Sequence, residues 1–65
     1  MDTIYSRLRE LRIDNNMTQK EIGQYLGTSG NMYQKYEYGY VELPVRHAKK
    51  LGNLYEIDWW KLYEE

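Results

Sequence analysis

The polar side chains between Gly30 and Tyr38 have types and a spacing suited to recognising nucleic-acid bases. At 100° per residue, one side of a helix here would carry small or polar residues, namely Gly30, Asn31, Gln34, Lys35 and Tyr38. The other side would carry Met32, Tyr33 and Tyr36, which we expect to face a core. Amide side chains can form paired hydrogen bonds with adenine, and lysine favours guanine or phosphate. The pattern predicts a helix whose outer face can read base edges in a major groove.

The same residues also have a simpler interpretation as solvated helix surface. Gln34 and Lys35 are typical of exposed helix positions, and composition alone favours that interpretation. Their function therefore depends on the elements that surround them.

The sequence contains few residues that could form a catalytic or metal-binding site. Cysteine is absent, which excludes disulfides, thiolate metal sites and thiol catalysis. The single histidine, His47, has no evident nucleophile beside it, and we expect it on the surface or at an interface. No pair of carboxylates stands out as an acid–base pair. We expect no enzyme activity, no metal and no cofactor.

Length and charge narrow the class of protein further. Sixty-five residues form one domain, 1–65, and contain no apolar run of the roughly 20 residues that span a bilayer. The net charge is −1, but residues 1–53 carry +2 and residues 54–65 carry −3, so one face can still be positive. We expect a cytoplasmic protein without a membrane partner.

Apolar residues at helical spacing predict an all-α fold of five short helices. The first covers about 3–15, the second lies between Thr18 and Gly27, and the third covers about 30–38. The fourth has Pro44 in its first turn, and the fifth covers about 59–63 with Asp58 as its cap.

Capping signals mark the ends of the two central helices. Thr18 and Glu21 have the spacing of a capping box, and Ser29 is a good N-cap for the third helix. Gly27 and Gly39 suit the left-handed turns that end helices.

The turn between the second and third helices is too short for antiparallel packing. Residues 27–29 must therefore join two helices that cross steeply, as in a helix-turn-helix. A close crossing needs a small residue, and Gly23 supplies it in mid-helix at a cost of roughly 1 kcal/mol in helix propensity.

The spacing of these residues resembles the phage repressor and Cro-type, or XRE, helix-turn-helix family. The matching pattern is Thr18-Gln19-x-x-Ile22-Gly23-x-x-Leu26-Gly27-Thr28-Ser29-x-x-x-Tyr33-x-x-Tyr36-Glu37-x-Gly39. The resemblance extends over about residues 6–63. It implies a lambda-repressor-like five-helix bundle that binds double-stranded DNA, usually as a homodimer on a two-fold operator.

The resemblance also implies roles for single residues. Ser29, Gly30, Asn31, Gln34 and Lys35 match the family's base-recognition positions, and Gln19 matches a phosphate contact. Arg12 and Glu37 match an ion pair that ties the first helix to the end of the third.

The sequence departs from the family pattern around the third helix. Gly30 stands where relatives usually carry a long polar side chain, so this position cannot reach a base edge. The loop Gly39-Tyr40-Val41-Glu42 lacks the cations that relatives often carry, which lowers non-specific DNA affinity. Tyr38 and Tyr40 suit either packing or phosphate contact.

The aromatic C-terminal segment predicts a dimer interface. Trp59 and Trp60 are adjacent, so both cannot face the interior of one helix, and the second would be exposed unless another subunit covers it. We expect a homodimer interface formed by Trp59, Trp60, Leu62 and Tyr63.

Two hypotheses follow for the function. The first is a small sequence-specific DNA-binding regulator, repressor-like and of bacterial or phage type. The second is a protein-interaction module, antitoxin-like or adaptor, that keeps the fold with weak or no DNA binding. The net charge of −1, Gly30 and the uncharged 39–41 segment favour the second hypothesis.

Overall fold

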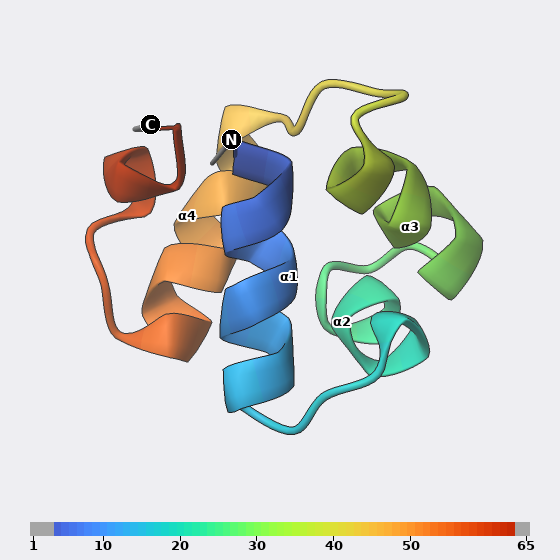
Figure 1. Cartoon of the computed structure of the whole chain (residues 1–65), viewed down its shortest axis with the longest axis horizontal. Coiled ribbons are helices and arrows are strands. Elements are labelled where there is room, and N and C mark those ends of the chain that lie inside the picture. The colour runs from blue at the N-terminus through green and yellow to red at the C-terminus, as the bar shows by residue number, and fades with distance from the viewer. Residues whose placement is uncertain (1–3, 64–65) are drawn as a thin grey trace.

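Four α-helices and one 3₁₀ helix make up the part of the chain that the computed structural model describes, residues 4–63. The helices are α1 (Ile4–Asp14), α2 (Gln19–Tyr25), α3 (Gly30–Tyr38), α4 (Val45–Tyr55) and η1 (Trp59–Tyr63). Figure 1 shows α1 in front, α4 and η1 on one side of it, and the α2–α3 pair on the other. Within residues 4–63 no helix is both long and apolar enough to cross a membrane.

The capping signals are confirmed. The Thr18 hydroxyl accepts a hydrogen bond from the Glu21 amide at 3.1 Å, and the Glu21 carboxylate accepts one from the Thr18 amide at 2.8 Å. The Ser29 hydroxyl accepts from the Met32 amide at 3.1 Å. Gly27 and Gly39 have φ values of 80° and 82°, which glycine adopts without strain.

The buried core draws on every helix that the structure describes. Its members are Leu8, Ile22, Leu26, Tyr33, Tyr36, Leu43, Ala48, Leu51, Tyr55 and Leu62. Tyr33 and Tyr36 are buried as predicted, and they anchor the inner face of α3. The opposite face of α3 is thereby fixed toward the outside of the bundle.

The ends of the last two helices differ from the prediction. Pro44 precedes the first turn of α4 as its N-cap, with an extended ψ of 148°. The fifth helix is a 3₁₀ helix, and the Lys61 amide donates to the Asp58 carbonyl at 3.0 Å, three residues back. A single short segment commonly takes this tighter form, so the all-α class stands with four α-helices rather than five.

Candidate nucleic-acid interface

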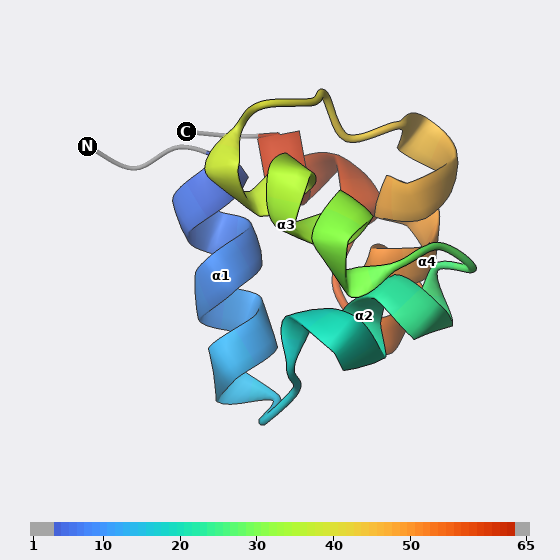
Figure 2. The same cartoon turned by 90° about the vertical axis from the view of Figure 1, so that its right-hand side faces the viewer.

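A close crossing of α2 and α3 forms the helix-turn-helix, and Figure 2 shows the two helices side by side at the front of the molecule. A Cβ atom on Gly23 would lie 2.4 Å from the carbonyl carbon and oxygen of Ser29. Real Cβ contacts are never this short, and the neighbouring atoms are backbone, so only glycine permits this approach.

Gly30 is a second contact of the same kind, and here the predicted orientation was wrong. A Cβ on Gly30 would lie 2.9 Å from the Lys20 Cα, so this position points at α2 rather than outward. Its lack of a side chain is explained by the helix crossing. The helical-wheel pattern missed this because it contains no information about the neighbouring helix.

The remaining polar residues of α3 lie largely as the pattern predicts. Asn31 and Lys35 are exposed, Gln34 is partly buried, and Tyr38 is 54% exposed. Ser29 is exposed, but its hydroxyl already accepts the capping hydrogen bond from Met32.

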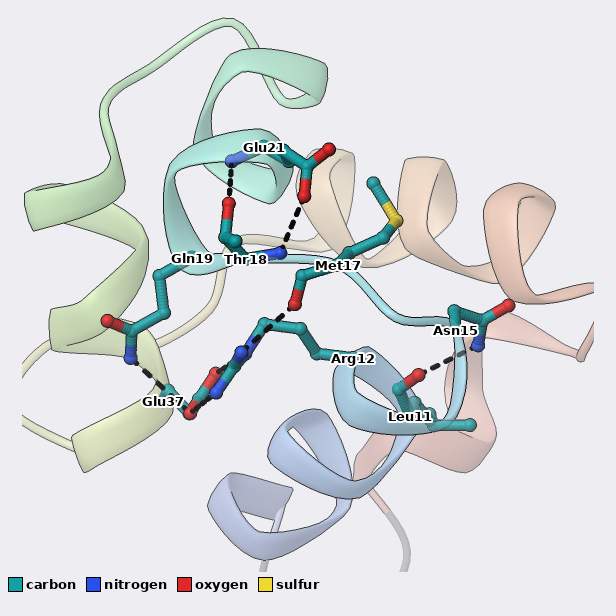
Figure 3. Close-up of polar contacts among 8 residues, drawn as sticks. All are labelled: Leu11, Arg12, Asn15, Met17, Thr18, Gln19, Glu21 and Glu37. Carbon is teal, nitrogen blue, oxygen red and sulfur yellow. Dashed lines mark hydrogen bonds and ion pairs between the residues drawn. The ribbon is translucent and has the colours of Figure 1, made fainter.

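Gln19 lies at the start of α2 and is held by a buried ion pair (Figure 3). The Glu37 carboxylate accepts hydrogen bonds from Arg12 Nε and Nη2 at 2.9 and 3.0 Å. Gln19 Nε2 donates to the same carboxylate at 3.4 Å. Arg12 Nη1 also donates to the Met17 carbonyl at 3.0 Å. Three segments therefore meet at one point, namely α1, the turn that precedes α2, and the C-terminal half of α3.

This polar cluster is screened from water. The Glu37 side chain is 2% exposed and that of Arg12 15%. The hydrogen bond to Glu37 raises the pKa of Arg12, against the opposing effect of burial. Burial raises the pKa of Tyr33, and it raises that of Tyr55 to about 12. The Arg12 guanidinium therefore stays protonated at neutral pH, and its hydrogen bonds to Glu37 and Met17 hold it in place.

A shallow groove runs between the N-terminal ends of α2 and α3. It is lined by Gln19, Lys20, Ser29, Gly30 and Asn31. Lys20 is an exposed cation beside Asn31 that the sequence analysis did not single out, although its place in the first turn of α2, next to Gln19, was a usable signal.

Tyr38 and Tyr40 form an exposed pair at the C-terminal end of α3. Their rings meet edge to face, with centroids 6.0 Å apart, and Tyr40 is 78% exposed. The two rings therefore contact each other while both remain exposed to water.

The aromatic segment of η1 divides into inward and outward residues. Trp59 is partly buried against the core, whereas Trp60 is 51% and Tyr63 37% exposed. Leu62 is fully buried in the core of the same chain, so the expected interface role does not hold for this side chain. The Tyr63 hydroxyl donates to the Leu43 carbonyl at 2.8 Å.

His47 was expected on the surface or at an interface, but it is buried inside the chain itself. Its ring is 8% exposed and packs against Tyr36, with centroids 5.8 Å apart. Within residues 4–63 the structure gathers no group of three histidine, aspartate or glutamate residues that could hold a metal ion.

Comparison with known proteins identifies the family. A model of the helix-turn-helix family matches residues 8–59, which is most of the chain. The match covers α2, α3 and α4 completely, most of α1, and the first residue of η1. No curated protein and no solved structure gives a significant match. The matched segment contains the Gly23 crossing and the Arg12–Glu37 pair described above, and the chain belongs to the XRE-like helix-turn-helix family of DNA-binding regulators.

Proposed function

We propose that the chain is a sequence-specific, repressor-like transcription regulator of bacterial or phage type, acting in the cytoplasm. The observation that carries this proposal is the two-sided character of α3. Tyr33 and Tyr36 are buried, while Asn31 and Lys35 are exposed on the other side. A major groove about 12 Å wide accepts a helix with such a face.

Asn31, Gln34 and Lys35 contact bases in this proposal, and Ser29, which lines the same groove as Asn31, assists them. Gly30 contributes only backbone, since a side chain there would collide with Lys20. Gln19, Tyr38 and Tyr40 contact phosphates. Phosphate contacts set the register of the protein, and base contacts set its choice of sequence.

The Glu37 carboxylate supports the assignment of Gln19. Its bond to Gln19 Nε2 leaves the second amide hydrogen available to a phosphate oxygen, which can only accept hydrogen bonds. Gln19 can therefore present a donor whose orientation is set before DNA arrives.

We propose that the regulator acts as a homodimer through Trp59, Trp60 and Tyr63. Two copies of α3 would then enter successive major grooves about 34 Å apart. The exposure of Trp60 and Tyr63, whose rings both contact that of Trp59, supports this interface.

A protein-interaction module is the second candidate. The loop 39–42 contains no lysine or arginine, and the net charge is −1. Both features weaken phosphate attraction and favour this alternative. It predicts that no duplex is retained even at low salt.

Selection of bound duplexes from a random pool tests the two candidates. The regulator proposal predicts enrichment of two related half-sites spaced by one helical turn. Recovery of unenriched duplexes at every ionic strength would contradict it and favour the interaction module.

A further inference from the structure

A second polar site lies on the other side of α3 from Gln19. An open hollow of about 480 Å³ separates the turn between α2 and α3 from the N-terminal half of α4. The buried rings of Tyr36 and His47 form part of its wall, and Thr28, Arg46 and Lys50 line it nearer the surface. Figure 2 shows the turn and α4 near each other at the right-hand side of the molecule.

Among the described residues, the hollow is lined by positively charged side chains and by no negatively charged ones. Arg46 and Lys50 are one turn apart on α4, and both are exposed. Neither has an ion-pair partner within the described part of the chain, and the residues that line the hollow include no carboxylate. Like charges at this spacing repel each other, and an anion between them would remove that repulsion.

The imidazole of His47 lies in the same positive electrostatic environment. Its pKa is lowered, first by burial and then by the charges of Arg46 and Lys50. Its Nδ1 atom is buried without a hydrogen-bond partner among the described residues. A buried polar atom of this kind costs free energy unless its surroundings supply compensation.

The walls of the hollow are held in place. The Tyr25 hydroxyl donates to the Lys50 carbonyl at 3.1 Å and ties α2 to α4. The Thr28 amide donates to the Gly23 carbonyl at 2.8 Å and fixes the turn. A ligand would therefore meet side chains on a rigid frame, which lowers the entropy cost of binding.

We propose that this hollow binds a phosphate group, held by Arg46 and Lys50 with the Thr28 hydroxyl as a neutral donor. The phosphate has two sources, the backbone of a DNA duplex or free phosphate. Assignment to DNA rests on the proposed function, because a helix in the major groove has phosphates on both sides. Gln19 would then hold one strand and Arg46 with Lys50 the other, in place of the missing cations of loop 39–42.

Lys49 and Lys50 form a matched pair for the test. They are adjacent lysines on α4, but the Lys49 ammonium lies 5.7 Å from the ring centre of Trp59, away from the hollow. Lys49→Gln and Lys50→Gln therefore change the net charge equally and differ only in the site that loses the cation.

The first experiment uses inorganic phosphate and the single histidine. Phosphate is titrated against chloride at constant ionic strength while the His47 ring is followed by NMR. A saturable shift is expected for the wild type and Lys49→Gln, with affinity at least fivefold weaker for Lys50→Gln. This result assigns free phosphate as a ligand.

The second experiment measures duplex affinity against salt. Lys50→Gln should lower the slope of log K against log salt by about 0.9, as for one lost phosphate contact, and Lys49→Gln should leave it unchanged. This result assigns the DNA backbone. Should the wild type bind no duplex, the proposed function fails and the first experiment alone decides the site. The proposal is overturned if the two variants behave identically wherever binding is observed. It is also overturned if phosphate gives no saturable response and the salt slope does not change.

Discussion

The Glu37 carboxylate holds the Arg12 guanidinium through two hydrogen bonds of 2.9 and 3.0 Å, across 25 positions of sequence. The contact joins α1 to the C-terminal half of α3 and places the same carboxylate within reach of Gln19. Buried ion pairs of this kind contribute little net stability, because desolvation offsets most of the attraction. In the proposed function the role of this pair is positional, since it fixes Gln19, the proposed phosphate contact, relative to α3.

Removal of Glu37 should be costly because it leaves the Arg12 charge without its partner. Glu37→Gln is expected to lower the free energy of unfolding by about 2–4 kcal/mol in urea denaturation. Glu10→Gln, at an exposed position on α1, is the control and should stay within about 0.5 kcal/mol. The double variant Arg12→Met with Glu37→Leu should recover most of the stability while weakening DNA binding through Gln19. Full DNA affinity in that variant would contradict the positional role.

Gly23 should tolerate no larger residue. Gly23→Ala places a Cβ 2.4 Å from backbone atoms of Ser29, and we expect a loss of about 3 kcal/mol or more as the helices move apart. Gly27→Ala is the comparison, because no atom lies within 4 Å of its Cβ and only the left-handed φ of 80° opposes it. Its expected cost is about 1–2 kcal/mol. Thermal or urea unfolding measures the loss of stability in both variants. Equal losses would show that the close helix crossing is not the reason for glycine at position 23.

Alkaline pH should destabilise the fold through buried tyrosines. Burial raises the pKa of Tyr55 to about 12, whereas an unfolded tyrosine titrates near 10. The folded state holds the proton more tightly, so the stability present below pH 10 is lost as pH rises toward 12. Tyr55 should contribute a slope of about 1.4 kcal/mol per pH unit in that window.

Tyr55→Phe tests this titration directly. The free energy of unfolding should fall less steeply above pH 10 in this variant, and at pH 7 it should change by no more than about 1 kcal/mol, because the hydroxyl has no protein partner among residues 4–63. Tyr40→Phe, which removes an exposed hydroxyl, should keep the wild-type slope. A Tyr55→Phe profile that overlays the wild type would show that this side chain does not titrate as proposed.

Trp60 should control dimer formation. Trp60→Ser is expected to raise the dimer dissociation constant roughly tenfold or more, because exposed aromatics at interface centres carry much of the binding energy. Val45→Ser, at a position 48% exposed on α4, should leave it unchanged. Sedimentation equilibrium measures both constants. A wild-type protein that stays monomeric at all concentrations would contradict the proposed homodimer.

Local signals predicted most of this fold from the sequence. The Thr18–Glu21 capping box, the Ser29 cap and Gly39 each act within a few residues of chain, so their effect can be read without knowing the tertiary structure. The apolar side of α3 was predicted for the same reason, because helical periodicity is a local property.

The misplaced residues depend on contacts between helices. Gly30 faces Lys20 because of the angle at which α2 and α3 cross, and a helical wheel contains no such information. Leu62 and His47 are buried by helices that pack on them from elsewhere in the chain. The candidate DNA face was therefore predictable as a set of residue types, while its edges required the packed structure.

The side-chain amide resonances give the most direct test of the claim that α3 is the DNA-reading surface. NMR spectra should be recorded with and without a duplex selected for binding. We expect the side-chain NH₂ signals of Asn31, Gln34 and Gln19 to shift, while that of Asn53, exposed near the far end of α4, stays in place. Unchanged Asn31 and Gln34 signals on saturation with duplex, or shifts confined to the Trp60 indole, would contradict the account.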